Sequence, residues 1–293
     1  MANLLWALIY KVFIFIAAGA VLKKLSGSKG EGAAKVFVWA ALYLLIPLYI
    51  FLTVWGTRLE TASWKIAACA LIVVLCGAGY ARLWAAKTGI SFRSHFLPVV
   101  FMNSAYLAIP VCTLIWGAQG AAYAIIYNVA VTVANFTLGV WWASKEKPIA
   151  EIAGLPVLYA VAAGALLNAF GAPFHGGLLK AGSIVSFVTL PVMLIFVGYR
   201  LGEINFKEAG LVLAGVCLRI GGGFVAGLVA VGLLGIKGPA AGVCVMVSSM
   251  PAAVYSYILT EKYQGNVPFA AASVFVGTLL SFFSIALIGY YFK

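Results

Sequence analysis

Long apolar runs alternate with short charged or glycine-rich breaks along the chain. A run of about 18 or more apolar residues can cross a bilayer as a helix, whereas a membrane β-barrel would show segments of roughly 10 residues with alternating polarity. The pattern therefore predicts an all-α polytopic membrane protein with ten transmembrane helices. We expect these spans at residues 3–22, 35–54, 63–85, 94–115, 119–142, 152–170, 178–199, 207–233, 238–260 and 267–290.

The composition supports this interpretation, because 65% of the 293 residues are hydrophobic and only 9% are charged. Soluble domains carry about 25% charged residues. The net charge of +12 alone would suit nucleic acid, but the Lys and Arg residues gather in loops between spans, so we expect no nucleic-acid partner. Most lie in loops that follow the odd-numbered spans. The positive-inside rule places those loops in the cytoplasm and both termini outside it.

A proline-led segment occurs twice in the chain. The segment "IPLYIFLTVWGTRLE" (46–60) resembles "LPVMLIFVGYRLGE" (190–203), and both carry Arg-Leu and a glutamate at the exit. This recurrence predicts two five-helix repeats, residues 1–147 and residues 148–293. Because five is odd, the second copy must enter the membrane from the opposite side. Inverted repeats of this kind are typical of secondary transporters.

Prolines and polar residues interrupt the fourth and ninth spans at related positions. The interrupting residues are Asn103, Ser104 and Pro110 in one span and Ser248, Ser249 and Pro251 in the other. A broken helix exposes backbone groups and must face protein or water. We expect each proline in the first turn of the helix that restarts, where two positively polarised N-termini would attract a carboxylate. Alternatively, the prolines only kink their helices and the hydroxyls bond to nearby backbone.

The stretch "FMNSAYLAIP" (101–110) resembles the fourth-span motif of the auxin efflux carrier family, F-x-N-x-G-x-x-G-x-P. The matching residues are Phe101, Asn103 and Pro110, and alanine replaces glycine at positions 105 and 108. The segment "MPAAVYSYILTEKY" (250–263) is similar to the ninth-span motif. The family includes plant auxin exporters and bacterial carriers of the malate or malonate type. Bile acid:sodium symporters share the general plan.

This resemblance implies a scaffold of helices 1, 2, 6 and 7 that forms a homodimer, and a transport domain of helices 3–5 and 8–10 that moves like an elevator. It also implies a small organic anion substrate, a mono- or dicarboxylate including auxin-like acids, bound where broken helices 4 and 9 cross. The long central loop of plant relatives is missing, which favours a bacterial inner membrane. The candidate substrate-binding residues are Asn103, Ser104, Pro110, Ser248, Ser249, Pro251, Tyr255 and Arg219.

Two basic residues fall inside predicted spans. Arg219 lies deep in the eighth span, and intramembrane charges are functional candidates. The chain contains no aspartate, so the counter-charge of Arg219 would be an anionic substrate or backbone carbonyls. The alternative is that Arg219 snorkels toward the cytoplasmic surface, near Glu208 or Glu203. We expect Lys11 to snorkel toward the outer surface.

Coupling and alternative functions depend on the remaining polar residues. Histidines and carboxylates fall in loops or at span ends, so the sequence predicts no cofactor and disfavours proton coupling through such groups. Sodium coupling stays open, because hydroxyl and amide side chains occur in spans five and ten, as Thr132, Asn135, Thr137, Ser273, Thr278 and Ser281. Further cavity candidates are Tyr127, Asn128 and Tyr257.

HExxH and GxSxG motifs are missing, so we expect no enzyme. The partners expected are the anion, the lipid bilayer and a second copy. Alternatives are a sodium-coupled symporter of the bile-acid type and a channel or sensor with the same fold.

Overall fold

The computed structural model describes residues 14–25, 30–57, 63–144, 147–173, 176–201 and 208–292, which are mostly helical. Within these residues no strand forms, apart from one bridged pair, Met102 and Ala252. Five described stretches are long and apolar enough to cross a membrane: Val36–Gly56, Ser63–Thr88, Ala108–Ala143, Ala209–Leu234 and Val267–Tyr291. The prediction of an all-α, multi-pass membrane protein is confirmed, whereas the ten-span inverted repeat stays a prediction. Lys11 and Glu203 lie outside the described residues.

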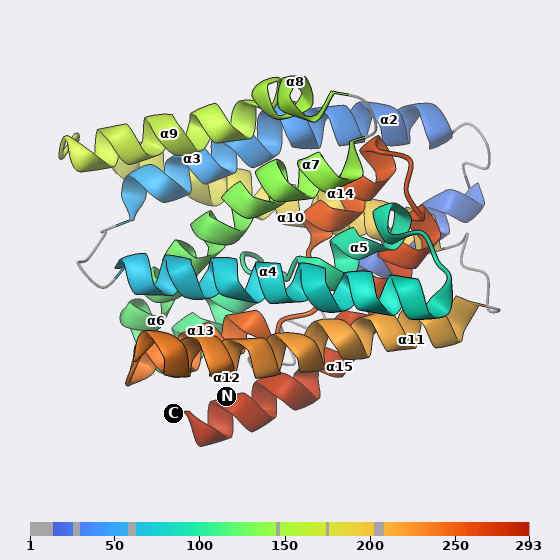
Figure 1. Cartoon of the computed structure of the whole chain (residues 1–293). Coiled ribbons are helices and arrows are strands. Elements are labelled where there is room, and N and C mark those ends of the chain that lie inside the picture. The colour runs from blue at the N-terminus through green and yellow to red at the C-terminus, as the bar shows by residue number, and fades with distance from the viewer. Residues whose placement is uncertain are drawn as a thin grey trace. The chain divides into compact units, whose positions relative to one another are not determined.

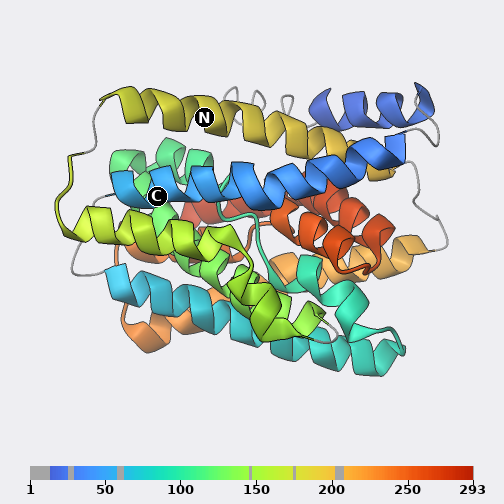
Figure 2. The same cartoon turned by 90° about the horizontal axis from the view of Figure 1, so that it is seen from above.

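The chain divides into two compact units, each made of two separate segments. Unit 1 takes Met1–Arg58 and Ser144–Ile204, and unit 2 takes Leu59–Ala143 and Asn205–Lys293. Unit 1 contains helical residues 14–25 and the helices α2 (Gly30–Ala40), η2 (Ala41–Leu45), α3 (Ile46–Gly56), α8 (Pro148–Ala153), α9 (Pro156–Ala169) and α10 (Gly176–Leu201). Here α3 lies between α9 and α10 (Figure 2).

Small residues and one amide hold the helices of unit 1 close together. A methyl group on Gly198 of α10 would overlap the carbonyl oxygen of Ile16, so α10 packs directly against the helix of residues 14–25. On the other side, the Asn168 amide of α9 donates to the carbonyl oxygens of Val54, Trp55 and Thr57 at the end of α3 (3.3, 2.9 and 2.5 Å). The last carbonyls of a helix have no partner inside the helix, so Asn168 caps α3 from the neighbouring helix.

Unit 2 contains the interrupted helices. Its elements are α4 (Ser63–Thr88), α5 (Phe92–Val100), α6 (Ala108–Ala134), η3 (Asn135–Gly139), α7 (Val140–Ala143), α11 (Ala209–Cys217), η5 (Leu218–Gly222), α12 (Gly223–Leu234), α13 (Pro239–Ser248), α14 (Val254–Lys262) and α15 (Val267–Tyr291). In Figure 1, α4 runs alongside α12, and it also contacts η5. The helices α5 and α14 also contact each other, as do α6 and α13.

Local sequence explains where several of these helices begin and end. Gly235 follows α12 in the left-handed conformation, which glycine adopts without a steric penalty. Pro239 opens α13 at a position where its missing N–H is no loss. The side chain of Asn266 caps α15 by accepting from the backbone N–H of Phe269. Gly117 has φ 66° and ψ −152° inside α6, so this long stretch is two helices, as predicted for the fourth and fifth spans.

Candidate functional site

Both predicted interruptions are present in unit 2. The helix α5 ends at Val100, and residues 101–107 are non-helical before α6 begins. In the same way α13 ends at Ser248, and residues 249–253 are non-helical before α14 begins. The side chains of both non-helical segments are almost all buried. The two breaks therefore lie in the protein interior, where their backbone groups need partners.

The two non-helical segments supply those partners to each other. They cross as an antiparallel bridge in which the Asn103 N–H donates to the Pro251 carbonyl oxygen (2.7 Å). The Ala253 N–H donates to the Phe101 carbonyl oxygen (2.9 Å). Each segment thus satisfies one donor and one acceptor of the other. Two helix C-termini and two helix N-termini meet at this crossing.

The two prolines do not occupy matching places, and this corrects the expectation for one of them. Pro110 is the third residue of α6, in its first turn, as predicted. Pro251 instead lies in the extended segment before α14, next to the bridged residue Ala252. Proline suits this position because the crossing uses only its carbonyl oxygen, so the missing N–H costs no hydrogen bond.

A pocket, partly open to solvent, lies beside the crossing, and the empty space in it, open solvent included, is about 280 Å³. Its lining consists of Met102, Asn103, Ser104, Ala105, Tyr106, Asn128, Val131, Thr132, Asn135, Ala253, Val254 and Tyr255. None of these described residues has a charged side chain. The lining instead combines amide and hydroxyl groups with apolar carbon, which is typical of a small-molecule site.

Hydrogen bonds connect the polar groups around the cavity. The Ser104 hydroxyl donates to the Asn128 side-chain oxygen (2.8 Å), and the Tyr255 hydroxyl donates to that of Tyr106 (3.1 Å). The second bond joins a side chain from each interrupted helix. Asn128 is 1% exposed, and its amide nitrogen has no hydrogen-bond partner among the described residues. A buried, unused donor of this kind is costly unless something binds there.

The predicted serines of α13 do not line the cavity. The Ser248 hydroxyl donates to the Cys244 carbonyl oxygen (2.6 Å), and the Ser249 hydroxyl bonds to the Val245 and Met246 carbonyls (3.0 and 2.9 Å). These bonds correspond to the alternative expected from the sequence, in which the hydroxyls bond to carbonyl oxygens of the nearby backbone. Ser248 therefore supports the end of α13 and does not reach the cavity.

Three of the predicted residues, Asn103, Ser104 and Tyr255, do line the cavity. Asn128, a further candidate, lines it too, whereas Tyr127 and Tyr257 do not. Tyr106 was missed by sequence reasoning. The signal that could have found it is its place in the non-helical segment, two residues after Ser104. As substrate-binding residues, all of these stay predictions.

Arg219 lies at the C-terminal ends of both α5 and α13. One terminal nitrogen donates to the carbonyl oxygens of Val99 (3.3 Å) and Val100, and the other donates to that of Ser248 (2.7 Å). The side chain is only 1% exposed and belongs to the π-helical segment η5. Single π turns inside α-helices are frequent at functional sites. Of the alternatives for Arg219, pairing with backbone carbonyls is the one observed.

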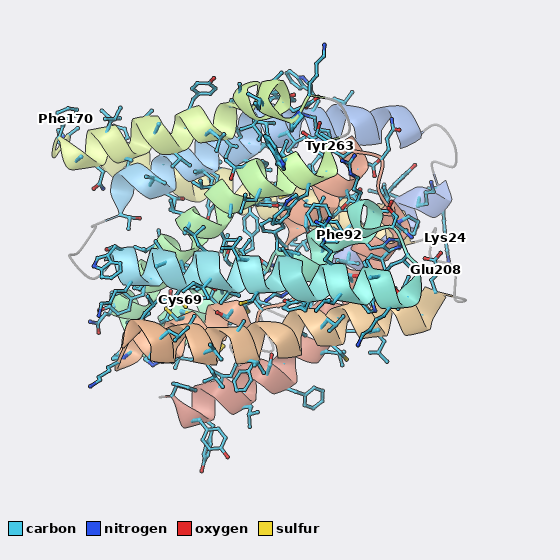
Figure 3. The ribbon with its side chains drawn as sticks, viewed as in Figure 1. Lys24, Cys69, Phe92, Phe170, Glu208 and Tyr263 are labelled. Atoms are coloured by element: carbon cyan, nitrogen blue, oxygen red, sulfur yellow. The ribbon has the colours of Figure 1, made fainter. Side chains whose placement is uncertain are left out.

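The alternative in which Arg219 snorkels to the surface near Glu208 is not the arrangement observed. Figure 3 shows Glu208 at the N-terminal end of α11, about three helical turns before Arg219. The Glu208 carboxylate accepts a long hydrogen bond from Asn266 (3.5 Å). Arg219 does not extend toward the surface because the carbonyl oxygens at the ends of two broken helices lie close enough to accept its hydrogen bonds.

Glycines let the Arg219 segment approach α13 closely. A methyl group on Gly223 would overlap the Ser248 carbonyl oxygen and the Arg219 guanidinium, and one on Gly227 would meet the Ser248 side chain at 2.7 Å. Both glycines belong to the run "GGGFVAG" (221–227), and small residues of this kind allow close helix packing. Larger side chains here would push Arg219 away from the crossing.

Five of the six residues considered for sodium coupling divide into two sets, and the sixth, Ser273, is buried with no hydrogen-bond partner for its hydroxyl among the described residues. Thr132 and Asn135 line the cavity. In contrast, the hydroxyls of Thr137, Thr278 and Ser281 bond to carbonyl oxygens three or four residues earlier in their own helices. Among the described residues, no group of three His, Cys or acidic side chains could hold a metal ion. The ligands that remain available to a cation are oxygen atoms of the cavity lining and of the helix ends.

A comparison with family models identifies the kind of protein that carries this crossing. Residues 140–289, about half of the chain, match the model described as "Membrane transport protein". The chain belongs to this family. It is the family of the auxin efflux carriers, so the resemblance found in the sequence is confirmed.

Two relatives of this membrane transport protein match along nearly their whole length. An uncharacterized transporter of Methanothermobacter thermautotrophicus is 27% identical, and the match covers 95% of each chain. An uncharacterized transporter of Methanocaldococcus jannaschii is 25% identical, over 95% of this chain and 96% of the relative. Both organisms are archaea, and a bacterial inner-membrane location stays a prediction.

Proposed function

We propose that the protein is a secondary transporter that binds a small organic anion at the crossing of its two interrupted helices. Membership of the membrane transport protein family supports transport. The anion is inferred from the charge balance at the crossing. Each N-terminus of a helix carries about +0.5 charge and each C-terminus about −0.5. Four helix ends meet here, and among the described residues a charged side chain, Arg219, contacts the negative pair alone.

The N-terminus of α14 is open to the cavity, since Ala253, Val254 and Tyr255 line it. Residues 102–106, which lead into α6, line its other side. The opposing C-termini of α5 and α13 are neutralised by Arg219. Without an acidic group in the lining, the two positive ends sum to about +1. A monoanion, or one carboxylate of a dianion, would neutralise this positive charge.

The observation that carries the proposal is the buried amide nitrogen of Asn128, which has no partner among the described residues and lies in the cavity lining. A carboxylate oxygen is a strong acceptor for such a donor. The hydroxyls of Tyr106 and Tyr255, which are hydrogen-bonded to each other, lie in the same lining. Together these groups would bind one carboxylate without a counter-charge from a metal ion.

We further propose that unit 2 carries the anion across the membrane in an elevator-type movement relative to unit 1. The support is the grouping of the chain, because unit 2 contains the entire crossing and unit 1 contains none of it. A carrier of this kind needs a rigid body around the substrate and a separate body to move against. Unit 1 would then form the proposed homodimer contact.

Counterflow in proteoliposomes tests this function. Vesicles loaded with small mono- and dicarboxylates, including indole-3-acetate, are supplied with each labelled acid in turn. The decisive variant is Asn128→Asp, which has nearly the same shape but adds a negative charge to the cavity. We expect at least tenfold lower uptake, since like charges repel strongly in a buried site. The matched control is Gln119→Glu, which makes the same change at an exposed position of α6 and should transport normally.

The outcomes separate the candidate functions. Counterflow that is lost in Asn128→Asp and kept in Gln119→Glu supports an anion carrier at this site. Equal counterflow in both variants would place the substrate elsewhere. Binding of an acid without counterflow would favour a channel or sensor. Uptake that requires sodium in the wild type would favour a sodium-coupled symporter.

A further inference from the structure

We propose that the Arg219 guanidinium acts as a built-in cation at the crossing, in the position where the C-termini of α5 and α13 could otherwise bind a free metal cation. Arg219 is thus a positioning residue, which holds the two C-terminal ends together. The proposal deepens the proposed function, because this crossing is the suggested anion site. It makes a separate claim about Arg219, which can be tested without any substrate.

The first argument is the set of hydrogen-bond partners. All three bonds of the guanidinium go to main-chain carbonyl oxygens, on Val99, Val100 and Ser248. Two of these residues end α5 and the third ends α13. Carbonyl oxygens at half-helix C-termini are the ligands that coordinate Na⁺ in transporters with interrupted helices. The guanidinium therefore uses the acceptors that a bound cation would use.

The second argument is charge. Two helix C-termini together carry about −1, and the guanidinium carries +1 with a pKa far above physiological pH. A charge this deeply buried is costly unless it is paired. Within the described part of the chain no carboxylate contacts Arg219, so the helix ends provide the pairing. The charge of the guanidinium is opposite in sign and about equal in size to that of the two helix ends. This explains how an arginine that is 1% exposed can be stable here.

The third argument is the close fit of the surrounding backbone. The π turn η5 carries Arg219, and Gly223 and Gly227 leave out side-chain volume where the helix meets Ser248 of α13. Here the guanidinium lies against the Ser248 carbonyl, and a single added methyl group would displace it. The chain thus builds a space for this one side chain at the crossing.

The consequence is a site that becomes empty when Arg219 is shortened. Arg219→Ser would leave three buried carbonyl oxygens without donors, next to a space large enough for a small cation. Sodium, lithium or methylguanidinium could then enter and restore the lost contacts. Wild-type protein, in contrast, already has its cation and should not respond to these ions.

The experiment measures the apparent Tm of purified protein in detergent, in sodium chloride or in N-methylglucamine chloride at about 0.15 M ionic strength. We expect the wild type to have the same Tm in both salts. Arg219→Ser should melt lower in N-methylglucamine and regain roughly 4 °C in sodium. Methylguanidinium should have the same effect as sodium. The conservative variant Arg219→Lys should remain close to the wild type in both salts.

Arg82→Ser is the matched control. It removes the same charge from an exposed position of α4, where Arg82 lies over the Phe92 ring, and should neither melt lower nor respond to sodium. If Arg219→Ser cannot be purified in N-methylglucamine, purification in sodium or methylguanidinium becomes the readout, and recovery there supports the proposal.

Three results would overturn the proposal: a wild type stabilised by sodium as strongly as the variant, an Arg219→Ser protein as stable as the wild type, or a destabilised variant that no small cation restores. Because these measurements need no substrate, they can fail while anion counterflow persists. They can equally succeed when no anion is transported.

Discussion

Gly223 controls the distance between the Arg219 segment and the end of α13, so Gly223→Ala is a sharp test of the crossing. The added methyl group would overlap both the Ser248 carbonyl oxygen and the guanidinium. Overpacking a tight interior costs about 1–3 kcal/mol. Losing the hydrogen bond from Arg219 to Ser248, which is 2.7 Å long, costs about 1.5–3 kcal/mol more, because the donor is charged.

One effect opposes this loss. Alanine is a better helix former than glycine by about 1 kcal/mol. The net expected destabilisation of Gly223→Ala is therefore about 2–5 kcal/mol. With roughly 2–4 °C of Tm per kcal/mol, the apparent Tm should fall by about 4–20 °C. Anion binding should weaken as well, because the same displacement moves one arm of the crossing.

Gly221→Ala is the matched control, two residues earlier in the same helix. A methyl group on Gly221 meets no heavy atom within 4 Å, so this variant should keep or slightly raise the Tm. Thermal unfolding of the two variants and the wild type, measured side by side in one detergent, checks the reasoning. Equal Tm values for both alanine variants would refute the close contact between η5, α12 and the end of α13.

Two further substitutions test other parts of the fold. Asn168→Asp should lower the Tm more than Asn168→Ala, because a carboxylate would face the three carbonyl oxygens that the Asn168 amide now caps; equal Tm values would show that the amide is not a donor there. Gly117→Ala should cost about 1–3 kcal/mol, since φ 66° and ψ −152° form a backbone conformation that is nearly exclusive to glycine. Gly232→Ala, at an equally open place within α12, should cost nothing in the same Tm measurement.

Several features of this protein follow from the sequence because they depend on neighbouring residues only. Long apolar runs predict helices of membrane length. The stretch "FMNSAYLAIP" predicts the interruption at residues 101–107, since the polar residues and Pro110 oppose a continuous helix there. Asn103, Ser104 and Tyr255 were found in this way, by lying in or next to a break, and all three line the cavity.

Other features depend on segments far apart in the chain. The partners of Arg219 include Val99 and Val100, about 120 residues away, and no local pattern indicates which carbonyls will be nearby. Likewise, Ser248 and Ser249 resembled Ser104 in sequence. Their hydroxyls bond to their own helix, since α13 ends at Ser248 and carbonyls of its last turns lie within reach.

Sequence alone thus determined that the helices form, where two of them break, and which polar residues lie at the breaks. Only the tertiary structure decided that Met102 bridges Ala252, that Tyr106 meets Tyr255 and that a buried arginine neutralises two helix ends. The physical reason is that hydrophobicity and proline act along a few turns of chain. The pairing of exposed helix ends is instead set by how whole helices pack, and here it rests on glycines that allow an unusually close approach.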